Sequence, residues 1–185
     1  MPPDFRSRTG PELVAFLSNA NPWIVRQARR ELADRRETSV IPLLRSAVLE
    51  TPNDSLALES LWALYVCGGF DDSIAERTLV HRSHAVRSWT VRFLGDARDV
   101  SPRLAERLTD LAVSEPDVRV RAQLAASARR LPAQVALRIV RALAIRDVDP
   151  GDPHVPLLLW WAVETHAIRA FREVEALVTS PEAWK

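Results

Sequence analysis

The sequence predicts an all-α protein built as a right-handed stack of about five helical hairpins. Apolar residues recur at helical spacing along the chain, for example Leu104, Leu108 and Leu111 at positions i, i+4 and i+7. Strand signals are nearly absent, and the chain contains no Asn-Gly or Asp-Gly turn. A two-helix pattern also recurs about every 30 to 35 residues, as a stack of hairpins requires.

Capping residues and prolines mark the expected beginnings of several helices. Thr9-Gly10-Pro11-Glu12 has the form of a capping box, with a proline near the first helical position. A residue that can cap a helix directly precedes a proline at Asn21-Pro22, Ser101-Pro102 and Asp152-Pro153. These four sites therefore predict where helices begin.

Glycines mark two of the expected helix ends, at Gly68-Gly69 and at Gly95. Together the start signals, the end signals and the apolar stripes predict eleven helices. Their expected ranges are 10–18, 22–36, 38–50, 54–67, 71–80, 83–95, 101–113, 117–130, 132–146, 153–166 and 168–178.

The second helix of each predicted pair begins in a similar way. Asn21-Pro22-Trp23-Ile24-Val25-Arg26 and Glu115-Pro116-Asp117-Val118-Arg119-Val120-Arg121 both place a Val-Arg pair after an acid or amide. Equivalent positions lie 31, 30, 34 and 35 residues apart, at Val25, Leu56, Val86, Val120 and Val155. Because one hairpin cannot bury its apolar face alone, neighbouring hairpins are expected to share a continuous core.

This pattern predicts one domain over residues 10–179. We expect residues 1–9 to be a disordered or extended segment, and residues 180–185 to begin a further segment cut short. The inner surface of the stack is expected from the second helices, over 22–36, 54–67, 83–95, 117–130 and 153–166.

The Val-Arg pair, the loop acid or amide before it, and an Ala-rich second helix resemble HEAT repeats over roughly residues 11–178. Two units depart from the pattern. Leu56-Ala57 replaces Val-Arg in the second unit, and Pro156 takes the arginine position in the fifth. Any ladder of charges along the stack should be interrupted there.

Four segments carry a closer resemblance, residues 13–23, 59–64, 152–161 and 180–185. Together they are similar to the HEAT region of large planctomycete and verrucomicrobial-type membrane-bound dehydrogenase/cytochrome proteins. In that family a β-propeller precedes the HEAT region and a c-type cytochrome domain follows it. The resemblance implies an exported redox enzyme as the parent protein, with this chain as a spacer that contributes no catalytic residue.

Composition narrows the classes of function. The net charge is +1, and 24 of the 25 basic residues are arginine, so the chain lacks the strong positive charge of many nucleic-acid-binding domains. No apolar run approaches the ~18 residues of a membrane-spanning helix. The beginning of the chain has no secretory signal pattern, so we expect a soluble fragment whose parent is exported or periplasmic by resemblance.

Three arginines, Arg26, Arg87 and Arg121, occupy the same position of the repeat. They predict either a basic stripe on the concave face that binds phosphate or a charged partner, or a structural ladder that bonds loop carbonyls and acids such as Asp117. One such residue per repeat favours the ladder.

Two adjacent tryptophans, Trp160 and Trp161, point about 100° apart on a helix and so cannot face the same core. We expect one of them at the surface, where it would be a candidate to bind a partner. By contrast, Trp62 and Trp89 are expected to pack within or between repeats. Trp161 with Glu164 is also the nearest approach to a HEAT-like DNA glycosylase site, which requires an acid and aromatics in a basic groove.

Motifs for other chemistry are missing from the sequence. His81 with His84, and His154 with His166, lack an acid at ligand spacing, whereas zinc requires three or four ligands. We therefore expect no catalytic, cofactor-binding or metal-binding residue. The predicted function is a monomeric, non-catalytic scaffold that binds protein, either flanking domains or a docking partner, without membrane contact. The alternative is a nucleic-acid-binding module of the DNA glycosylase type.

Overall fold

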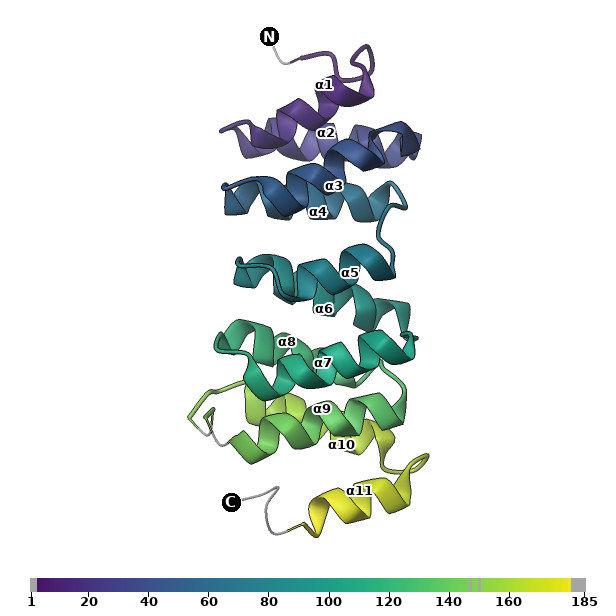
Figure 1. The fold of residues 1–185 in the computed structure, drawn as a ribbon, viewed down its shortest axis with the longest axis vertical. Helices are drawn as coiled ribbons and strands as arrows, with labels where there is room; N and C mark the ends of the chain where they lie inside the picture. The colour runs from purple at the N-terminus through teal and green to yellow at the C-terminus, as the bar shows by residue number, and fades with distance from the viewer. Residues whose placement is uncertain (1–2, 147, 150, 181–185) are drawn as a thin grey trace. The chain divides into compact units, whose positions relative to one another are not determined.

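The computed structural model describes residues 3–146, 148–149 and 151–180 of the 185-residue chain. Over these residues the protein is all-helical, with eleven α-helices and no strand, which confirms the predicted class (Figure 1). By its contacts the chain divides into two compact units, Met1–Val86 and Arg87–Lys185, within the span for which one domain was predicted. The boundary falls inside helix α6 (His84–Ala97).

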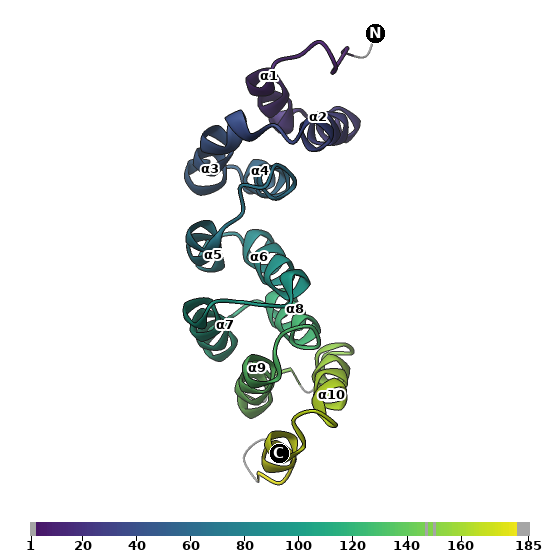
Figure 2. The same ribbon diagram turned by 90° about the vertical axis from the view of Figure 1, so that its right-hand side faces the viewer.

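The first unit arranges its helices in two layers, which can be followed in Figure 2. Helix α3 contacts both α1 and α5 in one layer, and α2 contacts α4 in the other. Contacts between α1 and α2 and between α3 and α4 close two hairpins. The helices are α1 (Gly10–Ala15), α2 (Pro22–Arg35), α3 (Ile41–Glu50), α4 (Asp54–Val66) and α5 (Asp72–Leu79), with short 3-10 turns at Phe16–Ser18 and Thr38–Val40.

The second unit repeats the two layers. Helix α9 contacts α7 and α11 in one layer, and α8 contacts α10 in the other. Leu108, Leu124 and Ile139 are fully buried between the layers. The helices that follow α6 are α7 (Pro102–Ser114), α8 (Val118–Ala128), α9 (Ala133–Arg146), α10 (Val155–His166) and α11 (Phe171–Val178).

Three of the predicted helix starts are confirmed. Thr9 and Glu12 form the reciprocal capping box at α1. The side chain of Asn21 accepts a hydrogen bond from the Trp23 N–H, and that of Ser101 accepts one from the Leu104 N–H. Each pairing satisfies a backbone donor that the helix itself leaves without an acceptor.

The fourth predicted start, at Asp152-Pro153, is wrong by two residues. Helix α10 begins at Val155, and Asp152 Oδ1 accepts from the His154 and Val155 N–H groups, both at 2.8 Å. Pro156 explains the shift. In a helix that began at Pro153, residue 156 would have to donate the first helical hydrogen bond, and proline has no N–H.

One of the two predicted glycine ends is confirmed, and the other is wrong. Gly68 has φ +78° just after α4, in the left-handed region that favours glycine. Gly95 instead lies inside α6, which continues to Ala97. A Cβ at Gly95 would lie 2.7 Å from the Cβ of Ser127 in α8, so this glycine permits a close approach of the two helices.

The segment before α1, expected to be disordered or extended, forms a turn in residues 4–8. The Arg35 guanidinium in α2 holds this turn, and the Phe5 ring lies edge-on to the rings of Phe16 and Trp23. Arg35 donates hydrogen bonds to three carbonyl oxygens of the turn, those of Phe5, Arg6 and Arg8. Of the segment predicted at 180–185, residues 181–185 lie outside the described residues, as do residues 1–2.

A capping aspartate makes part of the stability depend on pH. Asp71 Oδ1 accepts from the Ile74 N–H at 3.0 Å at the start of α5, and Arg45 donates to Oδ2. The Ile74 bond, followed by Arg45, holds the pKa of Asp71 below its ordinary value. Because the folded pKa is depressed, this stabilisation is present above about pH 4 and is lost as the pH falls below it.

Asp71→Asn keeps a capping side chain but removes this titration. Between about pH 4 and pH 2, we expect the free energy of unfolding to fall less in the variant than in the unsubstituted chain. Urea denaturation followed by circular dichroism at several pH values measures the difference. Identical slopes in that interval would show that the Asp71 carboxylate contributes nothing to acid sensitivity.

Candidate interaction surface

Arg87, near the start of α6, forms a bidentate ion pair with a buried carboxylate. Its Nε and Nη2 donate to Glu115 Oε2 and Oε1 at 2.8 and 2.6 Å. The Glu115 side chain is 1% exposed and that of Arg87 is 12% exposed. Glu115 Oε1 also accepts from the Asp117 N–H at 2.9 Å, which fixes the carboxylate in the loop before α8. The charge of Arg87 is therefore directed into the structure.

Arg121 repeats this arrangement one hairpin later. Its Nε and Nη2 donate to the two carboxylate oxygens of Asp149, at 2.6 and 2.5 Å, with side-chain exposures of only 8% and 10%. Nη1 donates to the Glu115 carbonyl oxygen at 3.0 Å, so the two arginines meet at the same loop residue. The hydrogen bond to Asp149 raises the pKa of Arg121 above its ordinary value.

Arg26 does not share this environment. It is exposed, and none of the other described residues forms a hydrogen bond or ion pair with its side chain. The partly buried contact in this part of the chain belongs to Arg29, one turn later, which forms an ion pair with Glu59 and lies 4.7 Å from the Trp62 ring centroid. Burial raises the pKa of Glu59 despite the lowering effect of Arg29.

Asp117, the acid named for the ladder, forms its ion pair with Arg119. The partners of Arg87 and Arg121 were not predicted, although a signal for them exists. Glu115 and Asp149 each lie 28 residues after the arginine that they pair with. The same interval after Arg26 leads to Asp54, which instead accepts hydrogen bonds from Arg82. Spacing alone therefore identifies candidate acids without deciding which arginine reaches them.

Both tryptophans of α10 are exposed, Trp160 by 54% and Trp161 by 39%, whereas one surface tryptophan was expected. The Arg129 guanidinium lies 5.6 Å from the Trp161 ring centroid. Glu164, one turn later, is exposed, and no described residue pairs with its carboxylate. Leu157, one turn earlier, is 46% exposed, so this face of α10 joins apolar surface to a single negative charge.

Trp62 and Trp89 are both half-buried. The Trp89 ring lies 5.6 Å from that of Phe93, and the Arg92 guanidinium lies 4.8 Å from the Trp89 centroid. The Trp89 ring thus packs against side chains of its own helix, and the Trp62 ring packs against Arg29 of α2.

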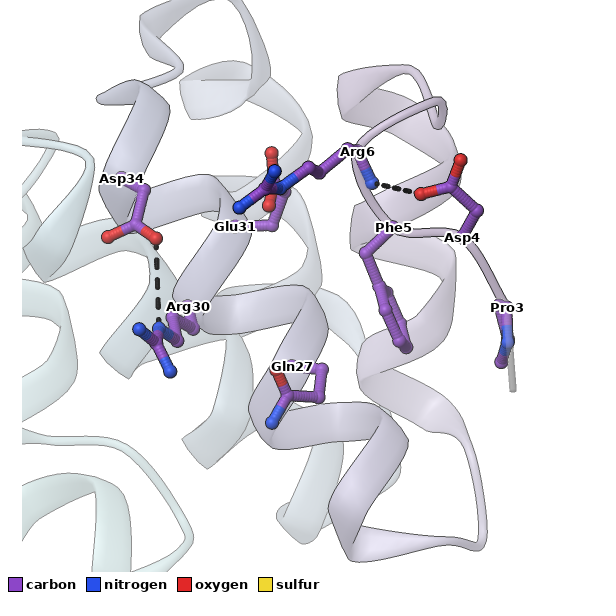
Figure 3. A pocket seen from close by; sticks show the side chains of 8 residues that line it. All are labelled: Pro3, Asp4, Phe5, Arg6, Gln27, Arg30, Glu31 and Asp34. Carbon is purple, nitrogen blue, oxygen red and sulfur yellow. Dashed lines mark hydrogen bonds and ion pairs between the residues drawn. The ribbon is translucent and has the colours of Figure 1, made fainter. Parts of the chain in front are cut away.

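A groove of about 340 Å³ lies between the N-terminal turn and α2 (Figure 3). Its charged side chains have both signs, and an Arg30–Asp34 ion pair of 3.7 Å lies along it. The lining residues are Pro3, Asp4, Phe5, Arg6, Gln27, Arg30, Glu31 and Asp34. In the described part of the chain, no three histidine, cysteine or acidic side chains are grouped so that they could hold a metal ion.

None of the described helices has the length and hydropathy needed to span a bilayer. Comparison of the chain with known protein families and with curated proteins finds no match. The HEAT resemblance and the closer resemblance to dehydrogenase/cytochrome proteins therefore stay predictions.

Proposed function

We propose that this chain is a HEAT-type right-handed superhelix that acts as a non-catalytic scaffold. The observation that carries the proposal is the pair of buried contacts, Arg87–Glu115 and Arg121–Asp149, which join successive hairpins at equivalent positions. An arginine whose charge is neutralised by a buried ion pair is not available to bind a ligand. Arg87 and Arg121 therefore serve stacking, whereas Arg26 is exposed, and the function lies in the geometry of the stack.

Within this proposal the chain is a spacer in a larger exported dehydrogenase–cytochrome protein. The support for this parent is the resemblance of residues 13–23, 59–64, 152–161 and 180–185 to the HEAT region of that family. The spacer holds flanking domains at a fixed separation or docks a protein on its inner face. It uses no cofactor of its own.

A distance measurement between the two units tests the spacer. Spin labels on cysteines introduced at Ser55 in α4 and Glu175 in α11, both exposed, report the separation by pulsed electron resonance. The native Cys67 is 2% exposed and should remain unlabelled. A stiff stack predicts one narrow distance distribution. A broad distribution would mean that the units move independently, which contradicts a spacer.

A gel-shift titration with duplex DNA at two salt concentrations tests the alternative. We expect no retarded band, because the net charge is +1 and two of the three repeat arginines are already paired with carboxylates. Binding that weakens steeply as the salt rises, and that Arg26→Gln reduces, would favour the nucleic-acid-binding module instead. Glu106→Gln on α7 would serve as a variant that leaves all arginines in place.

A further inference from the structure

Helix α10 presents an aromatic face that contains one carboxylate without a described partner. Leu157, Trp160 and Trp161 are all more than one-third exposed. Glu164 follows Trp160 at i+4 and Trp161 at i+3, so all four side chains lie on one face of the helix. Val155, Leu159 and Val163 form the opposite, buried face.

Elsewhere, the chain places an arginine between a tryptophan ring and a carboxylate. On α4, Glu59 and Trp62 lie one turn apart, and Arg29 of α2 forms an ion pair with the acid and stacks over the ring. This arginine comes from a helix that lies alongside α4 in the same layer. Three parts therefore complete the site: a ring, an acid one turn away, and an arginine from the neighbouring helix.

A second example forms within α6. The Arg92 guanidinium lies 4.8 Å from the Trp89 centroid, and its Nε lies 3.7 Å from Asp96 Oδ2. The planar guanidinium suits this position because it stacks on an aromatic face and also binds a carboxylate with its edge. A guanidinium that stacks on tryptophan and pairs with an acid thus occurs on two helices, although in α6 the arginine belongs to the same helix and Asp96 lies two turns after Trp89.

Helix α10 carries two tryptophan rings and one acid, but only one of the two rings has an arginine over it. Arg129, which directly follows α8, lies over Trp161, and no described acid pairs with Arg129. Trp160 and Glu164 provide a ring and an acid one turn apart, and no described arginine stacks on this ring or forms an ion pair with this acid. Leu157 adds an aliphatic contact one turn before Trp160. The surface of α10 at Trp160 and Glu164 therefore has the ring and the acid that an arginine side chain could contact.

We propose that Trp160 and Glu164 receive an arginine from a helix of a partner protein, which lies alongside α10 as α2 lies alongside α4. The partner's guanidinium stacks on the Trp160 ring and binds the Glu164 carboxylate, while an aliphatic residue one turn away covers Leu157. Arginine is preferred to lysine because a compact, strongly hydrated ammonium stacks poorly and cannot bind both oxygens through a rigid fork. This inference rests on the proposed role of the chain as a protein-binding scaffold.

The test uses the full chain, labelled with ¹⁵N so that the indole N–H signals of its tryptophans can be followed. The probe is a capped alanine–glutamine helix that carries one arginine and, four residues before it, one leucine. A second probe replaces that arginine with glutamine. We expect the arginine peptide to shift the Trp160 indole signal, and Glu164→Gln to weaken this binding by about threefold or more.

Glu106→Gln is the matched control, because it removes one exposed carboxylate from α7 in the other layer and should leave binding unchanged. Three results would overturn the inference: equal binding by the two peptides, equal binding by the Glu164→Gln variant, or no shift up to the solubility limit. Self-association of the chain that Trp160→Ala abolishes in sedimentation would also overturn it, since a second copy would then cover this face. The spin-label measurement needs no partner protein. A negative result with the peptides would therefore leave the spacer proposal unaffected.

Discussion

Replacing Glu115 with glutamine should lower the free energy of unfolding by about 3 kcal/mol. The carboxylate is 1% exposed, binds both Arg87 Nε and Nη2, and accepts the Asp117 N–H. Glutamine keeps the size of the side chain but leaves the Arg87 charge, only 12% exposed, without its counter-charge. Urea denaturation followed by circular dichroism measures the loss.

The matched control is Arg119→Gln, which breaks an ion pair with Asp117 in the same region. Arg119 has a side-chain exposure of 65%, so its pair is solvated and should contribute less than about 1 kcal/mol. If the two variants lost equal stability, the burial of Glu115 would have no energetic consequence, and the arginine positions would need another explanation.

Gly95→Ala should destabilise the second unit by about 2 kcal/mol, against the usual trend for alanine in a helix. The new Cβ would lie 2.7 Å from both the Cβ and the Oγ of Ser127, which is fully buried. Ser127 cannot easily move away, because its Oγ donates to the Val91 carbonyl oxygen at 3.2 Å. The overlap therefore has to separate α6 from α8, and the loss of packing outweighs the gain of about 1 kcal/mol in helix propensity.

Ser127→Gly in the Gly95→Ala background separates this effect from others. Removal of the Ser127 side chain should make the alanine less costly than it is in the parent chain, so the two changes should not be additive. Additive losses in thermal or urea unfolding would show that Gly95 is required for a reason other than the close approach of the two helices.

The sequence predicted the helices well because their signals are local. Thr9, Asn21 and Ser101 each cap the helix that follows them, as predicted, within a few residues of the cap itself. The errors arose where distant residues or a second proline decided the outcome. Glycine is common at helix ends, but Gly95 lies inside a helix because Ser127, 32 positions later, leaves no space for a side chain there. No capping side chain precedes α11, which begins at Phe171 and not at residue 168.

The candidate site was only partly predictable for the same reason. Helical periodicity shows that Trp160 and Trp161 cannot face the same core, but the exposure of both depends on which helices cover α10. Arg26 and Arg87 look alike in the sequence, yet Arg87 forms an ion pair with Glu115 and Arg26 forms none with a described residue. Arg29 and not Arg26 forms the partly buried ion pair because of the position of Glu59 on α4, which no local sequence pattern reveals.

A double-mutant cycle on Arg121 and Asp149 tests most directly whether these repeated arginines are structural. The unfolding free energies of the parent chain, Arg121→Gln, Asp149→Asn and the double variant give the coupling between the two side chains. Because both side chains are at least 90% buried and share two hydrogen bonds, we predict a coupling of about 2 kcal/mol. Losses that add to within about 0.5 kcal/mol would contradict the account, because the two charges would then not hold the hairpins together.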